Sequence, residues 1–321
     1  MTDTVEKQRS TATSPSPHDR RVGIGIAAAT AVVSGIAVAI NGYGVRAWAD
    51  YGGSATYTTG KNLVAAFVLV AVLAIVTARE SKEGFTKPRS RSQWAGLAAI
   101  AIVGGSVPFL LFFEGLSRAT STNAAFIHKS LIVFVALLAV PLLGEKLRVW
   151  HYAAIAVLLW GQAALAGGVA GLVAGTGEVM ILAATILWSI EVIIAKKLLV
   201  GLSPLTLAGA RMGLGSLILI GYGIFSGAFS ALGAVGMGEM GWVVLTGGVL
   251  SLFVLGWYSA LARAQAVDVM AVLVGGALIT SLIRTGFQGA ALPALGVGLI
   301  AAGVVIAVVG SLRQSSRPTT A

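Results

Sequence analysis

Charged side chains inside long apolar stretches are the features of this sequence best able to do chemistry. Glu191 lies near the middle of one such stretch, with Trp188 about one helical turn before it on the same face. An ionisable residue at this depth of a membrane helix is costly to insert and is a candidate functional group. The sequence supports two interpretations: a carboxylate that exchanges protons or binds a cationic substrate, or a buried ion pair with Arg211 or Lys196.

His128 and Lys129 form a second set, about two turns into another apolar stretch. Glu114, near the end of the preceding stretch, is close enough along the chain to reach Lys129. We expect His128 and Lys129 to face a cavity and contact an anionic or carboxylate-bearing substrate. In the alternative, Lys129 extends to the membrane interface and His128 is a hydrogen-bonded packing residue.

Other polar and charged groups are weaker candidates. Several could stack on a ligand or hydrogen-bond to it, although Trp and Tyr are also common at membrane interfaces: Asn41, Tyr43, Gln162, Trp257 and Tyr258. Lys61 and Arg211 lie near the ends of apolar stretches and are expected to be anchors or ion-pair partners. Glu145 and Lys146 are expected to form a network at a helix end that holds a gate closed or orders a loop.

Catalytic and metal sites are not expected. The three histidines lie on different segments and cysteine is absent, so no metal-ligand spacing arises. Gly60-Lys61 does not continue into a phosphate loop, because Ala55 and Asn62 stand where glycine and Ser or Thr are needed. The protein is therefore expected to be neither an enzyme nor an ATP-driven pump, and no cofactor is implied. A membrane-embedded transferase using His128 and Glu191 is the least favoured alternative.

The elements that position these residues are apolar helices. Hydrophobic residues make up 57% of the 321 residues and charged residues 11%, against about 25% charged in soluble domains. Ten stretches approach the roughly 20 residues that a spanning helix needs: 22–41, 62–78, 95–116, 122–143, 150–168, 179–195, 204–225, 241–262, 267–286 and 292–312. No period-2 alternation suggests a barrel, so the predicted fold is an all-α membrane protein.

Basic residues predict the orientation of the chain. Most Lys and Arg between the stretches fall on one side of the membrane if the amino terminus is cytoplasmic, which is the usual bias. Both termini are then cytoplasmic, with tails at 1–21 and 313–321. The net charge of +10 is spread over these loops and does not indicate nucleic acid. A cleaved signal peptide at 22–41 is disfavoured because its apolar region is too long.

A long-period repeat divides the chain into two units. The segment FEGLSRATSTNAAFI at 113–127 returns in altered form as YSALARAQAVDVMAV at 258–272. Lys61 then pairs with Arg211, and the units span 22–168 and 177–312 with five helices each. An odd number of helices inverts the second unit relative to the first, as in transporters built from inverted repeats.

The same residues carry a family resemblance. Segment 122–147, with its Gly144-Glu145 pair, resembles the fourth helix of the drug/metabolite transporter superfamily of EamA type, and Trp188, Ser189 and Lys196 are similar to its sixth-helix pattern. The resemblance implies a ten-helix bundle with a central cavity that moves small metabolites or drugs, often outward. The chain departs from the pattern at Gly289-Ala290, where the second half lacks the acidic residue.

The predicted function is a secondary active transporter, a proton-coupled exporter of small organic metabolites or drugs, in the cytoplasmic membrane. A passive facilitator is the alternative. The expected partners are a small-molecule substrate, membrane lipid and protons, without nucleic acid. The sequence leaves oligomeric state open, including a homo-oligomer.

Overall fold

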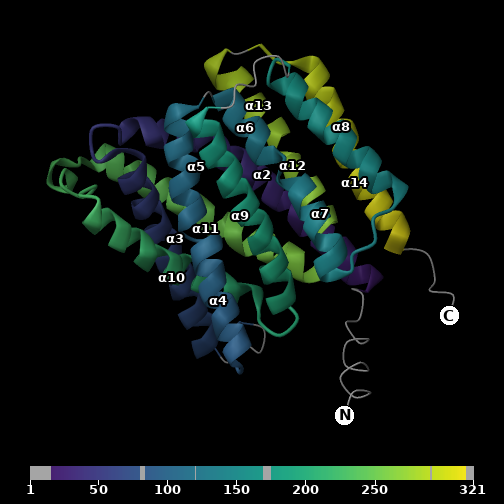
Figure 1. Cartoon of the computed structure of the whole chain (residues 1–321), viewed down its shortest axis with the longest axis horizontal. Coiled ribbons are helices and arrows are strands. Elements are labelled where there is room, and N and C mark those ends of the chain that lie inside the picture. Colours follow the sequence, from purple (N-terminus) through teal and green to yellow (C-terminus); the bar gives the residue numbers. More distant parts are fainter. Residues whose placement is uncertain (1–15, 80–83, 120, 169–174, 290, 316–321) are drawn as a thin grey trace.

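The protein is a bundle of helices (Figure 1). The computed structural model describes residues 16–79, 84–119, 121–168, 175–289 and 291–315, and within these it contains helices and no strands. The α-helices are α2 (Pro17–Ala47), α3 (Gly53–Ala78), α4 (Arg91–Val103), α5 (Val107–Arg118), α6 (Ser121–Lys129), α7 (Leu131–Leu143), α8 (Val149–Leu165), α9 (Thr176–Leu198), α10 (Pro204–Phe225), α11 (Met237–Arg263), α12 (Ala266–Val274), α13 (Gly276–Gln288) and α14 (Ala294–Ser315). A short 3-10 turn, η1 (Leu232–Ala234), lies between α10 and α11.

Each predicted apolar stretch is helical, but three stretches expected to be continuous are interrupted: 95–116, 122–143 and 267–286. The first breaks at 104–106, where a Cβ on Gly104 would collide with the carboxylate of Glu191. The second breaks at Ser130 and the third at Gly275. The prediction of unbroken helices was wrong here because tertiary contacts, rather than local apolar character, set the breaks.

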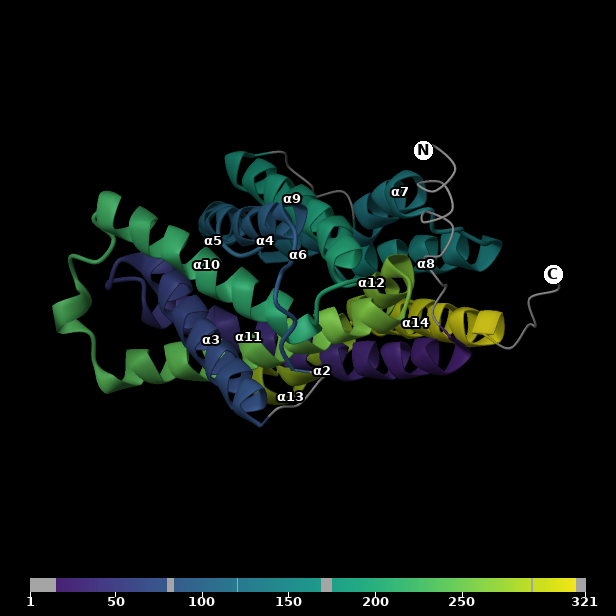
Figure 2. The same cartoon turned by 90° about the horizontal axis from the view of Figure 1, so that it is seen from below.

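Helices from the two halves of the chain pack on each other. α8 lies against α14, α2 against α11, α5 against α9 and α3 against α10, and Figure 2 shows α2 and α14 side by side at one end of the bundle. Small residues permit this approach: Gly161 on α8 faces Ile300 on α14, and Gly303 on α14 faces Leu158 on α8. Without a hydrophobic driving force in lipid, such close backbone contact is a main source of helix association.

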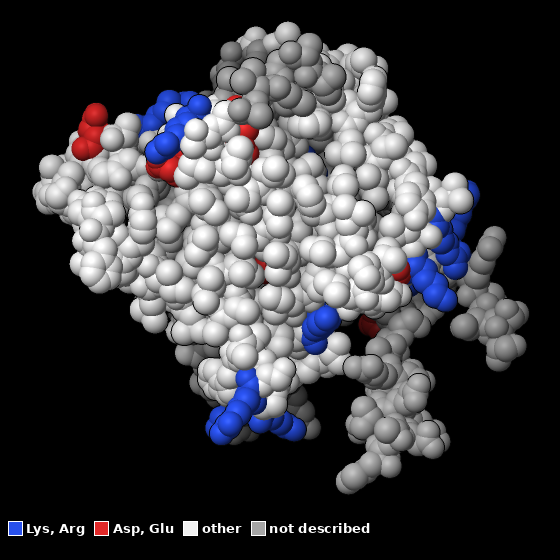
Figure 3. All heavy atoms as spheres, viewed as in Figure 1, with Lys and Arg blue, Asp and Glu red and all other residues white. Residues whose placement is uncertain are grey.

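The outer surface suits a bilayer. Nine spans of the described part of the chain are long and apolar enough to cross a membrane, three of them each made of two of the helices above, and the shorter apolar α8 is a tenth. Large apolar side chains such as Phe67, Trp160 and Leu217 are exposed on the outside. Figure 3 shows a broad face with very little charge, with Lys and Arg gathered at its upper left, lower and right-hand margins. An exposed apolar band between charged ends is typical of a multi-pass membrane protein.

The α8–α14 contact provides a test of this packing. A Cβ on Gly303 would lie 2.7 Å from Leu158, whereas one on Gly298 of the same helix would meet nothing within 4 Å. We expect Gly303→Ala to lower the free energy of unfolding by about 1–3 kcal/mol through overpacking, measured as thermal unfolding in detergent. Gly298→Ala, the matched control, should be neutral or stabilising. Equal effects of both substitutions would contradict a tight α8–α14 interface.

Candidate functional site

A central cavity lies between the two halves of the bundle. Its volume is about 200 Å³, and its walls come from α2, α3, α5, α6, α7, α9, α10, α11 and α12. The aromatic residues of its walls are Phe109, Phe112, Phe113, Trp188, Phe253 and Trp257. Asn41 and Thr246 contribute polar groups from α2 and α11. A largely apolar cavity with a few convergent polar groups is the usual form of a small-molecule site.

Lys61 contributes a buried positive charge to this cavity. Only 3% of the residue is exposed, and its Nζ donates a 3.0 Å hydrogen bond to Oδ1 of Asn41. The ammonium also lies 3.8 Å from the ring centroid of Phe113 and 5.3 Å from that of Tyr57. The expectation that Lys61 is an anchor near a helix end was wrong, because α3 begins nine residues earlier than predicted, at Gly53. Its alignment with Arg211 in the repeat predicted from the sequence was a signal that could have identified it.

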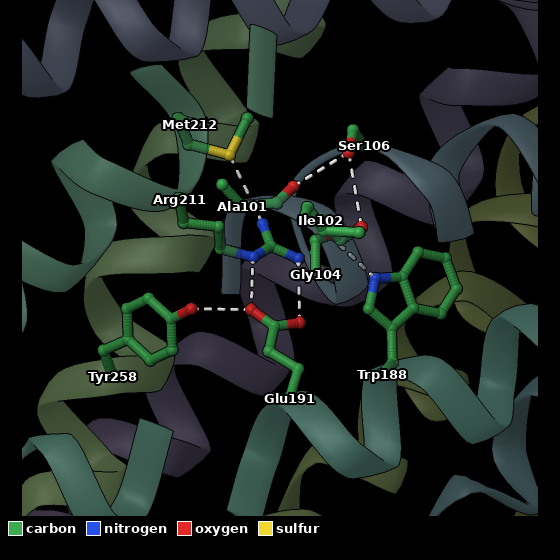
Figure 4. A network of polar contacts seen from close by, with 9 residues as sticks. All are labelled: Ala101, Ile102, Gly104, Ser106, Trp188, Glu191, Arg211, Met212 and Tyr258. Atoms are coloured by element: carbon green, nitrogen blue, oxygen red, sulfur yellow. Dashed lines mark hydrogen bonds and ion pairs between the residues drawn. The ribbon is translucent and has the colours of Figure 1, made fainter. Parts of the chain in front are cut away.

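Arg211 enters the cavity from α10 and is held by Glu191 of α9 (Figure 4). Arg211 Nε lies 2.5 Å from Glu191 Oε1, and its second terminal nitrogen lies 3.3 Å from Oε2. Tyr258 donates a 2.6 Å hydrogen bond to the same carboxylate, which is fully buried. Glu191 does not line the cavity itself. Of the two ion pairs considered for it, the structure contains the one with Arg211.

Lys196, the other partner considered for Glu191, lies elsewhere. Its Nζ donates to the backbone carbonyls of Leu261 and Ala264, at 2.5 Å each. These carbonyls belong to the carboxyl-terminal end of α11, where a positive charge is favourable. Lys196 therefore joins α9 to the α11–α12 junction.

Trp188 joins the first interhelical break to the cavity wall. Its indole Nε1 donates a 3.2 Å hydrogen bond to the carbonyl of Gly104, which ends α4 (Figure 4). Its ring lies 5.1 Å from the ring of His128, centroid to centroid, and His128 lies at the same distance from Phe112. His128 therefore packs in an aromatic group on the wall of the cavity, and its Nδ1 has no hydrogen-bond partner among the described residues.

Lys129 also lines the cavity, next to His128 at the end of α6. The expected contact between Glu114 and Lys129 was wrong. Glu114 instead pairs with Arg118 at 2.6 Å, with both side chains about half exposed, because the two residues lie one helical turn apart on α5. Glu114 does not line the cavity.

The cavity is electropositive. Three cations line it, Lys61, Lys129 and Arg211, and among the described residues no Asp or Glu does. The one carboxylate that approaches, Glu191, is committed to Arg211. In the described part of the chain, neither lysine forms a salt bridge. At low dielectric an uncompensated charge is costly unless a counter-charge arrives.

Trp257 and Asn41 occupy the places expected of ligand-contacting residues. Trp257 lines the cavity with its ring 5.6 Å from the guanidinium carbon of Arg211, and its indole Nε1 has no hydrogen-bond partner in the described structure. Asn41 accepts hydrogen bonds from both Lys61 and Tyr57 through the same Oδ1. The structure thus brings Asn41, His128, Lys129, Trp188 and Trp257 to one cavity.

Glu145 closes one end of the bundle. Its carboxylate accepts hydrogen bonds from the backbone N–H groups of Ala266, at 2.6 Å, and Val267, at 3.2 Å, and so caps the amino end of α12. Burial raises the pKa of the Glu145 carboxyl, and these two donors oppose that shift. Lys146, predicted to belong to the same network, is exposed and forms no salt bridge in the described structure.

A buried pair strengthens this closure. Nε2 of His151 lies 3.1 Å from Asp268 Oδ1, and Ser311 donates a 2.8 Å hydrogen bond to Asp268 Oδ2. The contacts tie α8, α12 and α14 together at the end where Glu145 lies. These contacts hold the helices together at this end of the bundle.

A metal centre has no basis in the described residues, since none of them form a group of three His, Cys, Asp or Glu side chains suited to an ion. The groups that face the cavity are ammonium, guanidinium, imidazole and aromatic rings. Such groups are suited to contacting a ligand.

The apolar surface and the spanning helices define a multi-pass helical membrane protein. Residues 24–166 match the model of the EamA-like transporter family, which confirms the resemblance predicted from the sequence and indicates a membrane transporter. The matched family is one of transporters and not of enzymes.

Solved structures agree on the fold. One, titled "Crystal structure of protein", aligns with a TM-score of 0.69 over 90% of this chain and 99% of its own length, at 17% sequence identity. At this identity the likeness concerns the fold alone. No curated protein gives a significant match.

The Glu191–Arg211 pair makes a prediction for stability. Removal of one partner leaves the other charge buried, so Glu191→Gln and Arg211→Gln should each lower the free energy of unfolding by about 3–5 kcal/mol. The double variant should lose clearly less than the sum, measured by thermal unfolding in detergent. Glu114→Gln is the matched control, since an exposed ion pair contributes about 0–1 kcal/mol. Additive losses would show that the two side chains do not act as a pair.

Proposed function

We propose that the protein is a secondary transporter of small organic anions, with a carboxylate bound between Lys61 and Lys129. The observation that carries the proposal is the buried ammonium of Lys61, which lines the cavity and has no carboxylate partner in the described structure. An anionic ligand would supply the missing counter-charge and form charge-assisted hydrogen bonds.

The shape and lining of the cavity favour an apolar or aromatic body on the ligand. Phe109, Phe112 and Phe113 lie on one side, and Trp257 stacks on Tyr258 with ring centroids 4.7 Å apart on another. Aromatic pairs prefer stacked or edge-to-face contact. The proposed substrate class is therefore a small carboxylate with an apolar or aromatic group, which refines the earlier expectation of metabolites or drugs.

Alternating access by two inverted units is the proposed mechanism. The packing supports it. The first helix of unit one, α2, packs on α11 of unit two, and the first helix of unit two, α9, packs on α5 of unit one. The pairs α3–α10, α7–α12 and α8–α14 each join corresponding spans of the two units. A two-fold relation between units 22–168 and 177–312 would produce this pattern. In the described state, the contacts of Glu145, Lys196 and Asp268 close one end. A state that is open at this end and closed at the other would require these contacts to break.

Proton coupling is proposed to act through Glu191. Its carboxylate holds Arg211, which lines the cavity. Protonation of Glu191 would free Arg211 to bind an anion, so proton binding and anion binding would favour each other. A proton and an anion would then cross in the same direction, with the substrate gradient driving export from the cell. An anion that moves alone is instead driven outward by an inside-negative potential, at about 2.3 kcal/mol per charge per 100 mV. This second route corresponds to a passive facilitator.

The first transport prediction concerns charge selection. Proteoliposomes containing the full chain should take up radiolabelled benzoate in preference to phenylethylamine, a cation of similar size. Lys61→Gln should lower kcat/KM for benzoate by roughly tenfold or more, because one charge-assisted hydrogen bond is lost. Lys197→Gln, at an exposed position on α9, is the control and should transport normally. A preference for phenylethylamine would refute the proposed substrate class.

The second transport prediction separates the two driving forces. With an imposed pH gradient and no potential, liposomes with the wild type should take up benzoate faster than protein-free liposomes, into which the neutral acid diffuses unaided, and Glu191→Gln should lose this faster uptake. The flux is expressed per folded protein, since the substitution also affects stability. Uptake by Glu191→Gln as fast as that of the wild type would remove this residue from coupling. A wild type that responds only to potential would favour the facilitator.

A further inference from the structure

A second cavity lies against the central one, at the end of the bundle opposite Glu145. Its volume is about 280 Å³, and its walls come from α2, α6, α8 and α13, and from the segment before α14. Val38 and Lys129 line both cavities. Lys129 is therefore placed between two hollows rather than at the edge of one.

The second cavity contains a buried donor without a partner. Gln162 is 5% exposed, and its amide Nε2 has no hydrogen-bond partner in the described part of the chain. A buried unsatisfied donor costs roughly 1–3 kcal/mol, so a protein rarely keeps one without a reason. The adjacent residue, Gly161, faces α14, while Gln162 lines the cavity, one step around α8. The amide is thus available to a ligand in the cavity.

The charges around this donor are all positive. Lys129 lies on one wall, and Arg284 of α13 lies on another, exposed and without a salt bridge in the described structure. The hydroxyls of Ser281 and Thr285 line the same wall as Arg284, and among the described residues no carboxylate lines the cavity. Two cations, a free amide N–H and two hydroxyls match the acceptor oxygens of one carboxylate.

We propose that this second cavity is an anion-binding subsite, in which a carboxylate is held by Arg284 and Gln162 and passes to or from the central cavity through Lys129. The inference rests on the proposed transport of organic anions and adds a second binding site to the transport path. Lys129 contacts the anion in both positions, so the ligand keeps a counter-charge as it moves. In a low-dielectric interior this continuity lowers the cost of crossing between the sites.

Equilibrium binding of radiolabelled benzoate to the purified full chain tests the subsite. The wild type should show two classes of site. Arg284→Gln and Gln162→Leu should each weaken the second class by roughly tenfold or more and leave the first class intact. Lys61→Gln should remove the first class and retain the second. Arg284→Lys should largely restore binding, because it keeps the charge.

The controls separate charge from folding and one proposal from the other. Arg118→Gln removes a positive charge from a residue that lines neither cavity, and it should bind as the wild type does. Thermal unfolding confirms that each variant is folded. A single class of site in the wild type, unchanged in Arg284→Gln and Gln162→Leu, would overturn the subsite and leave the proposed function standing. Absence of benzoate binding to the wild type would overturn both.

Discussion

The cost of placing charge inside an apolar bundle is the constraint on which this structure depends. Arg211 meets that cost with Glu191 and Tyr258, whose contacts join α9, α10 and α11 at the cavity wall. Asp268 meets it with His151 and Ser311, which join α8, α12 and α14. The backbone N–H groups at the start of α12 would also be costly to bury without partners, and the carboxylate of Glu145 accepts hydrogen bonds from two of them. The first two of these groups each join three helices.

Lys61 and Lys129 stand apart from that arrangement. Lys61 has a neutral oxygen and aromatic faces around its ammonium, which stabilise a cation less than a carboxylate does. The repeat predicted from the sequence aligns Lys61 with Arg211, and Arg211 has a carboxylate partner, Glu191. The two aligned cations therefore differ: Arg211 is paired within its own half of the chain, whereas Lys61 has no carboxylate partner in the described structure. This difference is the main support for the proposed transport of anions.

Much of the fold followed from the sequence because membrane helices are dictated by length and apolar character. The apolar stretches, the EamA resemblance and the position of His128 and Lys129 at a cavity were reached that way. The interhelical breaks were missed, since Ser130 and the glycines near 104 and 275 interrupt runs that remain apolar. Lys61 was assigned to a helix end because the polar first turns of α3, from Gly53 to Gly60, look like a loop in sequence. Glu114 was paired with the wrong cation because the predicted helix ended at 116, whereas α5 continues to Arg118 and places it one turn from Glu114.

Gly104 links two of these features. Any side chain there would occupy the space of the Glu191 carboxylate, and the carbonyl of the same glycine accepts the hydrogen bond from Trp188. The α4–α5 break and the ion pair are therefore one structural unit rather than two. Across related chains, a residue larger than glycine at position 104 should be found only together with a residue shorter than glutamate at 191. The two positions are expected to covary although 87 residues separate them in the sequence.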